Sequence, residues 1–224
     1  FYFEVDEGPI WLPELAVDYF RTFATQYVSF LERDEKLARK KLSLKKIGEY
    51  GLKHDIEELA EDADELLEGK REGNTDGSMW KVAYTAPHRY ARIYDRRVLV
   101  MIDEFQYFSE FVYADKECRT SRLKGVPGHF HAPVESKVAP MLVTGSYIGW
   151  MMEIAEKYLE AGRLSPIYLN PYLLPEEGLR AVYKYAKVYN IPITHQTAAQ
   201  INELCLHDPF FISCVIQSNL PGKD

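Results

Sequence analysis

The chain has 224 residues, of which 46% are hydrophobic and 13% aromatic, enough for one packed domain or for one domain with a small lid. Its formal net charge of −7 excludes a general electrostatic attraction to nucleic acid or to anionic membranes, and leaves room only for local basic patches. No apolar run reaches the roughly 18–20 residues that span a bilayer. The three scattered cysteines are typical of reduced thiols, so we expect a cytoplasmic protein with no membrane partner.

The first third of the chain predicts a strand, a long helix and an insertion. Residues 1–5 are strongly β-prone, and residues 12–31 carry apolar side chains at helical spacings of three and four. In the stretch 32–77 a basic run precedes an acidic segment with its own helical stripe, which we interpret as a solvated helical insertion. A docking surface for a basic partner is the sharper alternative. The end of the insertion, 69–77, is a loop by composition.

The middle of the chain alternates helices with strands. A helical stretch at 79–94 leads into five uninterrupted apolar residues at 98–102, which are typical of a strand buried on both faces of a parallel sheet. Two further strands are expected at 139–143 and 166–169, with a helix at 147–161 between them. This alternation predicts an α/β fold with a parallel sheet.

From Pro175 onward the pattern becomes all-helical. Thr194 can cap a second helix, and Pro209 can begin a third. We therefore divide the chain into an α/β core at residues 1–171, which includes the helical insertion, and a small helical lid at residues 172–224.

An acidic pair follows the most apolar strand. Asp103 and Glu104 come directly after Ile102, and the carboxyl end of a parallel strand opens onto the crevice where such sheets bind ligands. An aspartate there can hold Mg²⁺, which takes one or two carboxylates and keeps several waters. The adjacent glutamate points elsewhere and can orient or deprotonate an attacking water. The alternative is an acidic pair that ends a core strand and caps the next helix.

Polar side chains also follow the neighbouring strand. Thr144 and Ser146 offer hydroxyl groups where a γ-phosphate and the attacking water would lie, and Ser146 is also suited to cap the following helix. Arg163 precedes the last expected strand, where a guanidinium can stabilise phosphoryl charge. A surface arginine near a helix C-terminus is the alternative.

Four segments together resemble the archaeal-type ATPases, which belong to the signal-transducing branch of the AAA-related P-loop ATPases. The resemblance covers most of the chain, from residue 1 to about residue 219, and it is weakest at 32–77 and 113–138. The segments are IDEFQ at Ile102–Gln106, VTGSYIG at Val143–Gly149, GRLSPIYLNP at Gly162–Pro171 and HDPFF at His207–Phe211.

The resemblance implies a P-loop-type parallel sheet that binds ATP and Mg²⁺. It implies that Asp103 and Glu104 are the Walker B acids, with Asp103 on the metal, and that Thr144 or Ser146 is the first sensor. It also implies a lid in residues 172–219. By its position, Arg163 suits an arginine finger or a phosphate sensor.

The chain departs from the family pattern in two places. The lid of the family usually carries a Gly-any-Pro element, whereas His207–Pro209 keeps only the proline. The phosphate loop, Gly-x-x-x-x-Gly-Lys-Ser/Thr, does not occur, although the family places it on the central strand just before the strand at 1–5. The chain also begins without a methionine. We therefore expect an upstream segment, a partner or a rearranged sheet to account for the missing strand.

The first functional hypothesis is an ATPase module of a larger protein that hydrolyses ATP with Mg²⁺ but has little or no activity as this chain alone. The family often carries a further domain downstream, through which nucleic acid or a signalling protein would be the partner. The rival hypothesis is a degenerate or truncated scaffold that binds no nucleotide and acts by protein contact.

The long connection at 109–138 holds a weaker candidate. His129 and His131 are two residues apart, a spacing that suits a metal site, with Cys118 or Glu135 as a further ligand. The aromatic run that precedes it, 107–113, indicates a buried helix start or, alternatively, a partner-facing ridge.

Overall fold

The computed structural model describes residues 1–73, 77–160, 162–167 and 169–218. The chain divides into two compact units, Phe1–Ser165 (unit 1) and Pro166–Asp224 (unit 2), a division slightly before the one placed at residue 171 from the sequence. Each unit has a hydrophobic core of its own. Over the described ranges, no helix is long and apolar enough to cross a bilayer.

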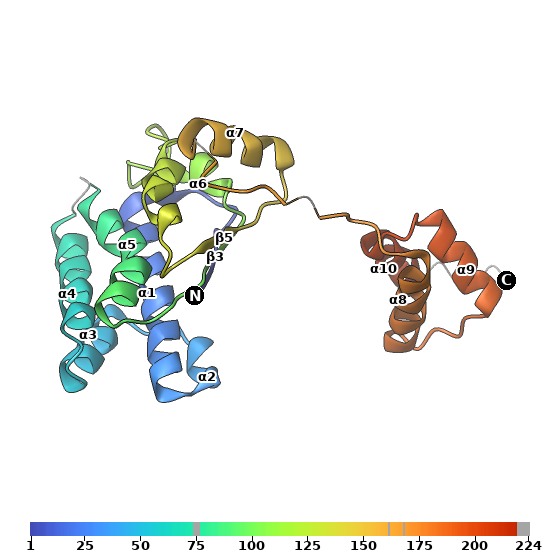
Figure 1. Ribbon diagram of the computed structural model, residues 1–224, viewed down its shortest axis with the longest axis horizontal. Helices are drawn as coiled ribbons and strands as arrows, with labels where there is room; N and C mark the ends of the chain where they lie inside the picture. Colours follow the sequence, from blue (N-terminus) through green and yellow to red (C-terminus); the bar gives the residue numbers. More distant parts are fainter. Residues whose placement is uncertain (74–76, 161, 168, 219–224) are drawn as a thin grey trace. The chain divides into compact units, whose positions relative to one another are not determined.

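A three-stranded parallel sheet forms the centre of unit 1 (Figure 1), which makes the protein mixed α/β and confirms the strands expected near residues 1–5, 98–102 and 139–143. A second, two-stranded parallel sheet lies in the same unit. The order in the first sheet is β1 (Tyr2–Glu4), β3 (Val100–Asp103), β5 (Met141–Val143), and the second sheet pairs β2 (Ile10–Trp11) with β4 (Val112–Tyr113).

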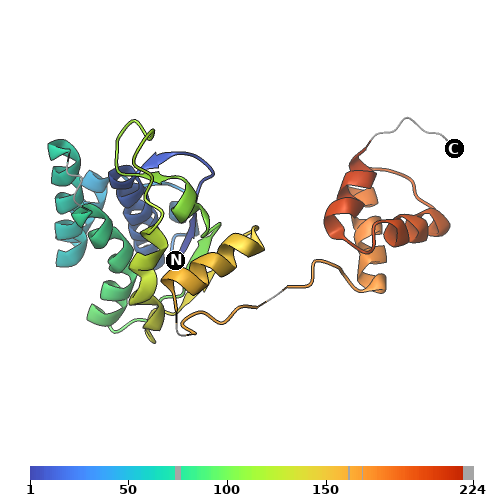
Figure 2. The same ribbon diagram turned by 90° about the horizontal axis from the view of Figure 1, so that it is seen from above.

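Helices cover unit 1 as the sequence predicts. In both Figure 1 and Figure 2, α1 lies between the sheet and the α3–α4 pair, and α1 also packs against α5. The expected helices at 12–31, 79–94 and 147–161 and the helical insertion are therefore present. Their bounds are α1 (Leu12–Glu32), α2 (Glu35–Ala38), α3 (Leu44–Lys53), α4 (Glu57–Glu72), α5 (Ser78–Ile93), α6 (Tyr107–Glu110) and α7 (Ile148–Tyr158), with 3-10 helices η1 (Val126–His131) and η2 (Pro133–Glu135).

The loop expected at 69–77 begins later than predicted. Helix α4 continues to Glu72 and ends at Gly73, whose φ of +68° is the left-handed conformation that glycine adopts without a steric penalty. Residues 74–76 lie outside the described residues. In the long connection, Tyr107 and Phe108 are buried at the start of α6, which confirms the buried helix start.

Aromatic side chains dominate the core of unit 1. Phe3 of β1, Tyr19 of α1, Trp80 of α5 and Phe130 of η1 are each no more than 4% exposed. The rings of Tyr19 and Trp80 meet edge to face at 5.4 Å, and those of Trp80 and Phe130 do so at 6.0 Å. Such pairs contribute about 0.5–1.5 kcal/mol each beyond the area that they bury, so this cluster holds α1, α5 and the sheet together.

Only one face of the sheet is well covered. Val100 and Ile102 of β3 are almost completely buried, whereas Leu99, just before β3, is 47% exposed and Leu142 of β5 is 48% exposed. The expectation of a strand buried on both faces is therefore wrong for β3. The apolar residues between the buried ones face the side on which the described helices do not pack closely.

The outer edge of β1 is closed by a side chain. The Tyr2 N–H donates to Gln26 Oε1 at 2.9 Å, and Gln26 Nε2 donates to the Tyr2 carbonyl at 2.7 Å. The amide of Gln26, from α1, thus takes the place of a neighbouring strand. The outward-facing backbone groups of Tyr2 are therefore satisfied without a neighbouring strand at this residue.

The outer edge of β5 is open. The carbonyl of Pro140 and the N–H of Thr144 bond to β3, so the alternate residues, Met141 and Val143, direct their backbone groups away from β3. No strand among the described residues pairs with this edge. The two edges of the sheet therefore differ: Gln26 occupies the β1 edge at Tyr2, whereas the β5 edge pairs with no strand among the described residues.

The strand expected at 166–169 is not formed by its described residues. Pro166, Ile167 and Leu169 lie outside every strand, and Ile167 and Leu169 are 78% and 84% exposed. Tyr168 lies outside the described residues. An apolar run of this kind becomes a strand only when another strand pairs with it, and the described residues supply none.

Unit 2 is the expected helical module. Thr194 accepts a hydrogen bond from the Thr197 N–H at 3.2 Å and caps α9, and Pro209 is the first residue of α10. Val182, Ala198 and Ile212, one from each helix, are completely buried at its centre. Its helices are α8 (Pro175–Val188), α9 (His195–Leu204) and α10 (Pro209–Gln217).

A buried histidine gives unit 1 a predicted pH dependence. Both ring nitrogens of His88, on α5, lack a hydrogen-bond partner, and burial lowers its pKa from 6.5 to about 4, with a smaller effect from Arg92. His88 therefore stays neutral in the folded state down to about pH 4, whereas in the unfolded chain it is protonated below about pH 6.5. We expect the free energy of unfolding to fall by about 3 kcal/mol as the pH drops from 6.5 to 4.

The measurement is urea unfolding at several pH values between 4 and 7.5. The variant His88→Gln should show a flatter dependence, whereas His54→Gln, at an exposed position, should retain the slope of the wild type. An unchanged slope in His88→Gln would contradict the assignment.

Candidate functional site

The carboxyl ends of β3 and β5 meet at one edge of the sheet. The Thr144 N–H donates to the Ile102 carbonyl at 2.9 Å, and the Phe105 N–H donates to the Thr144 carbonyl at 3.0 Å. These bonds continue the strand pairing past the last residues of the strands. The polar residues that follow β3 and β5 are therefore held against one another.

The Asp103 carboxylate accepts three hydrogen bonds. Thr144 Oγ1 and the Glu104 N–H donate to Oδ1, the latter at 3.0 Å, and the Tyr2 hydroxyl donates to Oδ2 at 3.1 Å. The bond from Thr144 is the main reason that the pKa of Asp103 lies below its usual value. Asp103 is thus an ionised carboxylate that neighbouring residues hold in place.

The Glu104 carboxylate is bound by the turn after β5. Ser146 Oγ donates to Oε1 at 2.5 Å, the Ser146 N–H donates to Oε2 at 3.4 Å, and Gln106 Nε2 also donates to Oε2. These bonds, that of the Ser146 hydroxyl first, lower the pKa of Glu104. A carboxylate with a low pKa orients a water molecule better than it removes a proton from one.

The backbone conformation at Glu104 directs the carboxylates of Asp103 and Glu104 toward different partners. Its φ of +53° lies in the left-handed region, which residues other than glycine rarely adopt. None of the groups that donate to Asp103 or Glu104 is a backbone N–H of α6, so the alternative in which this pair caps the next helix is not observed.

Ser146 does not cap α7. The residue at the N-cap is Tyr147, which makes no side-chain capping bond, and the Ser146 hydroxyl is bound to Glu104 instead. The capping role expected for Ser146 is therefore wrong, because the adjacent carboxylate is a stronger acceptor and lies within reach.

Two residues of the site were not assigned a role from the sequence. Tyr2 reaches Asp103 from β1, and Gln106, which is fully buried, reaches Glu104. A β-carbon added to Gly145 would lie 2.1 Å from Gln106 Oε1, so a larger residue in the turn would displace the glutamine side chain or the turn. The IDEFQ sequence contains Gln106, but only the fold brings it against Gly145.

Arg163 has partners of its own. Its Nε lies 2.9 Å from Glu135 Oε1 in an ion pair, and its Nη1 donates to the Glu160 carbonyl at 2.6 Å. Its side chain is only 20% exposed, unlike that of a free surface arginine. The structure thus gives Arg163 a role in holding η2, and its contact with phosphate stays a prediction.

The histidine pair in η1 lacks the ligands of a metal site. Trp80 Nε1 donates to His129 Nδ1 at 2.8 Å, which ties this imidazole to the aromatic core, and burial lowers its pKa. Nowhere in the described part of the chain do three or more His, Cys, Asp or Glu side chains form a group suited to a metal ion.

The donor set at the end of β3 fits one expected ligand and not the other. One ionised carboxylate, Asp103, beside the hydroxyl of Thr144 suits Mg²⁺, which binds few protein oxygens and keeps its waters. The polyphosphate of ATP needs a cradle of backbone N–H groups and a lysine, and the 224 residues contain no Gly-x-x-x-x-Gly-Lys-Ser/Thr to supply it.

Comparisons of the chain with protein-family models, with curated proteins and with solved structures found no match. What the site shows is two polar turns, at the ends of adjacent parallel strands, that bind each other through two carboxylates and two hydroxyl groups.

Proposed function

We propose that unit 1 is the magnesium- and water-handling half of a P-loop-type ATPase site, which a phosphate-binding loop outside these 224 residues completes. The observation that carries this proposal is the pairing of Thr144 with Asp103 and of Ser146 with Glu104 at the carboxyl edge of a parallel sheet. A sheet of this kind binds ligands at that edge.

Each residue then has a distinct role. Asp103 would hold Mg²⁺, and the ion would supply charge neutralisation for the phosphates. Glu104 orients the attacking water. The hydroxyl groups of Thr144 and Ser146 keep the two carboxylates ionised and apart, and they lie where a γ-phosphate would be detected.

The open edge of β5 supports the location of the missing loop. A strand that adds in parallel beside Met141 and Val143 ends at the same edge as Asp103 and Thr144. It also places its own following loop next to them and pairs the free backbone groups of β5. At the β1 edge, Gln26 already occupies the outward-facing backbone groups of Tyr2, which favours the β5 edge as the position of the added strand.

The test is ATP binding with and without the missing element. We expect the 224-residue chain to show no binding of a fluorescent ATP analogue below roughly millimolar concentration, because nothing in it cradles the phosphates. The complete gene product should contain the Gly-x-x-x-x-Gly-Lys-Ser/Thr element and bind with micromolar or higher affinity. Turnover by the isolated chain at an ordinary ATPase rate, or a complete gene product without the element, would refute the proposal.

The second candidate function is a scaffold that binds no nucleotide and acts by protein contact. The open β5 edge and the exposed Leu142 beside it favour this candidate, since a partner can add a strand to such an edge. The same titration separates the two functions, because the scaffold binds no ATP in the complete protein. In the first function, unit 2 is the lid, and nucleic acid or a signalling protein would be bound through a further domain.

A further inference from the structure

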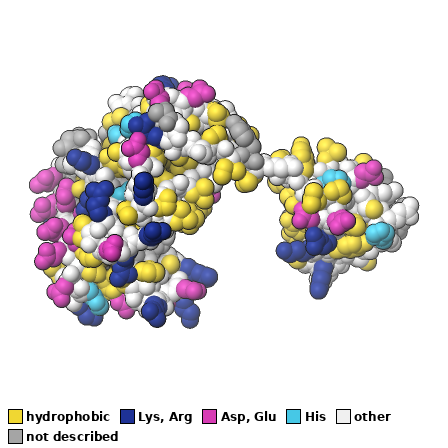
Figure 3. Space-filling model, in the orientation of Figure 1, with side chains coloured by type: hydrophobic (Ala, Val, Ile, Leu, Met, Phe, Trp, Pro, Cys, Tyr) yellow, Lys and Arg dark blue, Asp and Glu magenta, His cyan; other side chains and the backbone are white. Residues whose placement is uncertain are grey.

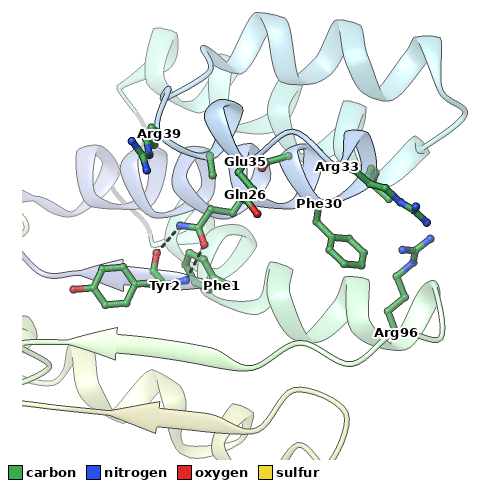
Figure 4. A pocket seen from close by; sticks show the side chains of 11 residues that line it. Phe1, Tyr2, Gln26, Phe30, Arg33, Glu35, Arg39 and Arg96 are labelled. Atoms are coloured by element: carbon green, nitrogen blue, oxygen red, sulfur yellow. Dashed lines mark hydrogen bonds between the residues drawn. The ribbon is translucent and has the colours of Figure 1, made fainter.

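A basic hollow lies in unit 1 beside the start of β1, between α1, α2 and the segment before β3 (Figure 4). Its volume is about 870 Å³, and Phe30, Arg33, Arg39 and Arg96 line it. A smaller pocket of about 350 Å³ shares Phe30 and Arg96 with it and adds Arg97. The hollow is separate from the carboxyl edge of the sheet, because it is formed at the opposite end of β3.

The arginines of the hollow and of the smaller pocket have no carboxylate partner among the described residues. Arg33, Arg39, Arg96 and Arg97 are all exposed, and none of them forms an ion pair with a described residue. In Figure 4, Arg33 and Arg96 extend toward the same space beside Phe30. Guanidinium groups that face one space without a counter-charge favour an anion there.

These arginines form a basic patch on a chain whose net charge is negative. The net charge is −7, and the acidic side chains of the visible face of unit 1 gather over α4 in Figure 3, away from the basic ones around α2. Only one carboxylate, that of Glu35, lines the hollow. The separation of the charges produces a local positive field that the total charge conceals.

An exposed aromatic ring accompanies the arginines. Phe30 is 66% exposed, and the guanidinium carbon of Arg96 lies 5.6 Å from the centre of its ring. Burial does not explain why a phenylalanine stands here, because most of its surface faces water. An exposed ring among arginines is the arrangement with which proteins bind single strands, since bases stack on the ring and phosphates pair with the cations.

We propose that this hollow binds single-stranded nucleic acid. The phosphates pair with Arg33, Arg39 and Arg96, and one base stacks on Phe30. A duplex keeps its bases stacked inside and cannot offer one to the ring. An acidic peptide would use the arginines but would gain nothing from Phe30, and this difference separates the two ligands.

The experiment measures the fluorescence anisotropy of a labelled twelve-nucleotide oligo(dT) with the complete 224-residue chain at low salt and over a salt series. We expect binding that weakens as salt rises. Replacing Arg33 and Arg96 together by Gln should weaken it by at least about tenfold and reduce the salt slope, by about 0.7 for each phosphate that is no longer neutralised. Phe30→Ala should weaken it by about 5- to 100-fold.

Matched controls make the result specific. Lys53→Gln removes an exposed cation on α3, and Phe210→Ala removes an exposed ring of unit 2, and both should bind like the wild type. Polyglutamate and inorganic polyphosphate serve as anions without bases, and their binding should not respond to Phe30→Ala.

Any one of the following outcomes would overturn the proposal. The first is no oligo(dT) binding at low salt. The second is an equal loss in the control variants, and the third is tighter binding of polyglutamate, or oligo(dT) binding that is indifferent to Phe30. Because all the substituted side chains are exposed, the variants should keep the fold, which circular dichroism checks directly.

Discussion

Replacement of Glu104 by Gln is expected to lower ATP hydrolysis by the complete protein by about 10²- to 10⁴-fold while ATP binding stays unchanged. Gln has almost the same shape as Glu, and its one oxygen can still accept the hydrogen bond from the Ser146 hydroxyl, which retains the main bond to the turn after β5. It lacks the negative charge that, in the proposed function, orients the attacking water. The measurement is phosphate release in one assay and nucleotide affinity in another.

The matched control for this variant is Glu110→Gln. Glu110 lies on the same stretch after β3, but its carboxylate forms an ion pair with Arg122 at 2.8 Å and does not contact the site. Its replacement should leave turnover within about twofold, because a partly exposed ion pair contributes little. Equal rates for Glu104→Gln and the wild type would remove Glu104 from the reaction and would favour the scaffold function.

The sequence predicts the strands and helices of unit 1 because local patterns determine them. The apolar run that contains Val100 and Ile102 predicts a strand, and the helical spacing at 12–31 predicts a helix with one apolar face. The sequence also predicts that Asp103 and Thr144 lie close together, since parallel strands end at a common edge.

Other parts of the structure depend on contacts between distant residues. The exposure of Leu99 and Leu142 reflects which face of the sheet the helices cover, and no pattern within a strand records that. The failure of the segment 166–169 to form a strand has the same origin, because a strand requires a partner. The basic hollow joins Arg33 to Arg96, which are far apart in the sequence.

The bond from Gln106 to Glu104 is a further contact of this kind. Gln106 is a polar residue that is fully buried, and its Oε1 has no hydrogen-bond partner among the described residues. A buried polar group without a partner costs about 1–3 kcal/mol. The hydrogen bond made by the other end of the same amide must offset this cost. The Nε2 end binds the Glu104 carboxylate, which links the buried glutamine directly to the site.

Gly145→Ala tests this link and should have a large effect on stability. The added β-carbon would lie 2.1 Å from Gln106 Oε1 and 2.8 Å from Met151 Sδ, distances that no real contact shows. Gln106 is fully buried, so either its side chain or the turn must shift to admit the β-carbon. We expect the free energy of unfolding to fall by about 1–3 kcal/mol, measured by urea denaturation. Hydrolysis by the complete protein should fall as well, because Glu104 loses a donor.

Gly149→Ala provides the control, since no atom lies within 4 Å of a β-carbon added there, and alanine within α7 should leave stability unchanged or raise it by up to about 1 kcal/mol. A double-mutant cycle identifies the cause. If Gly145→Ala acts through Gln106, it should cost much less when Gln106 is already Ala, because the obstructing amide is gone. Additive costs would show that the glycine is required by Met151 or by the backbone, and that Gln106 does not connect the turn after β5 to Glu104.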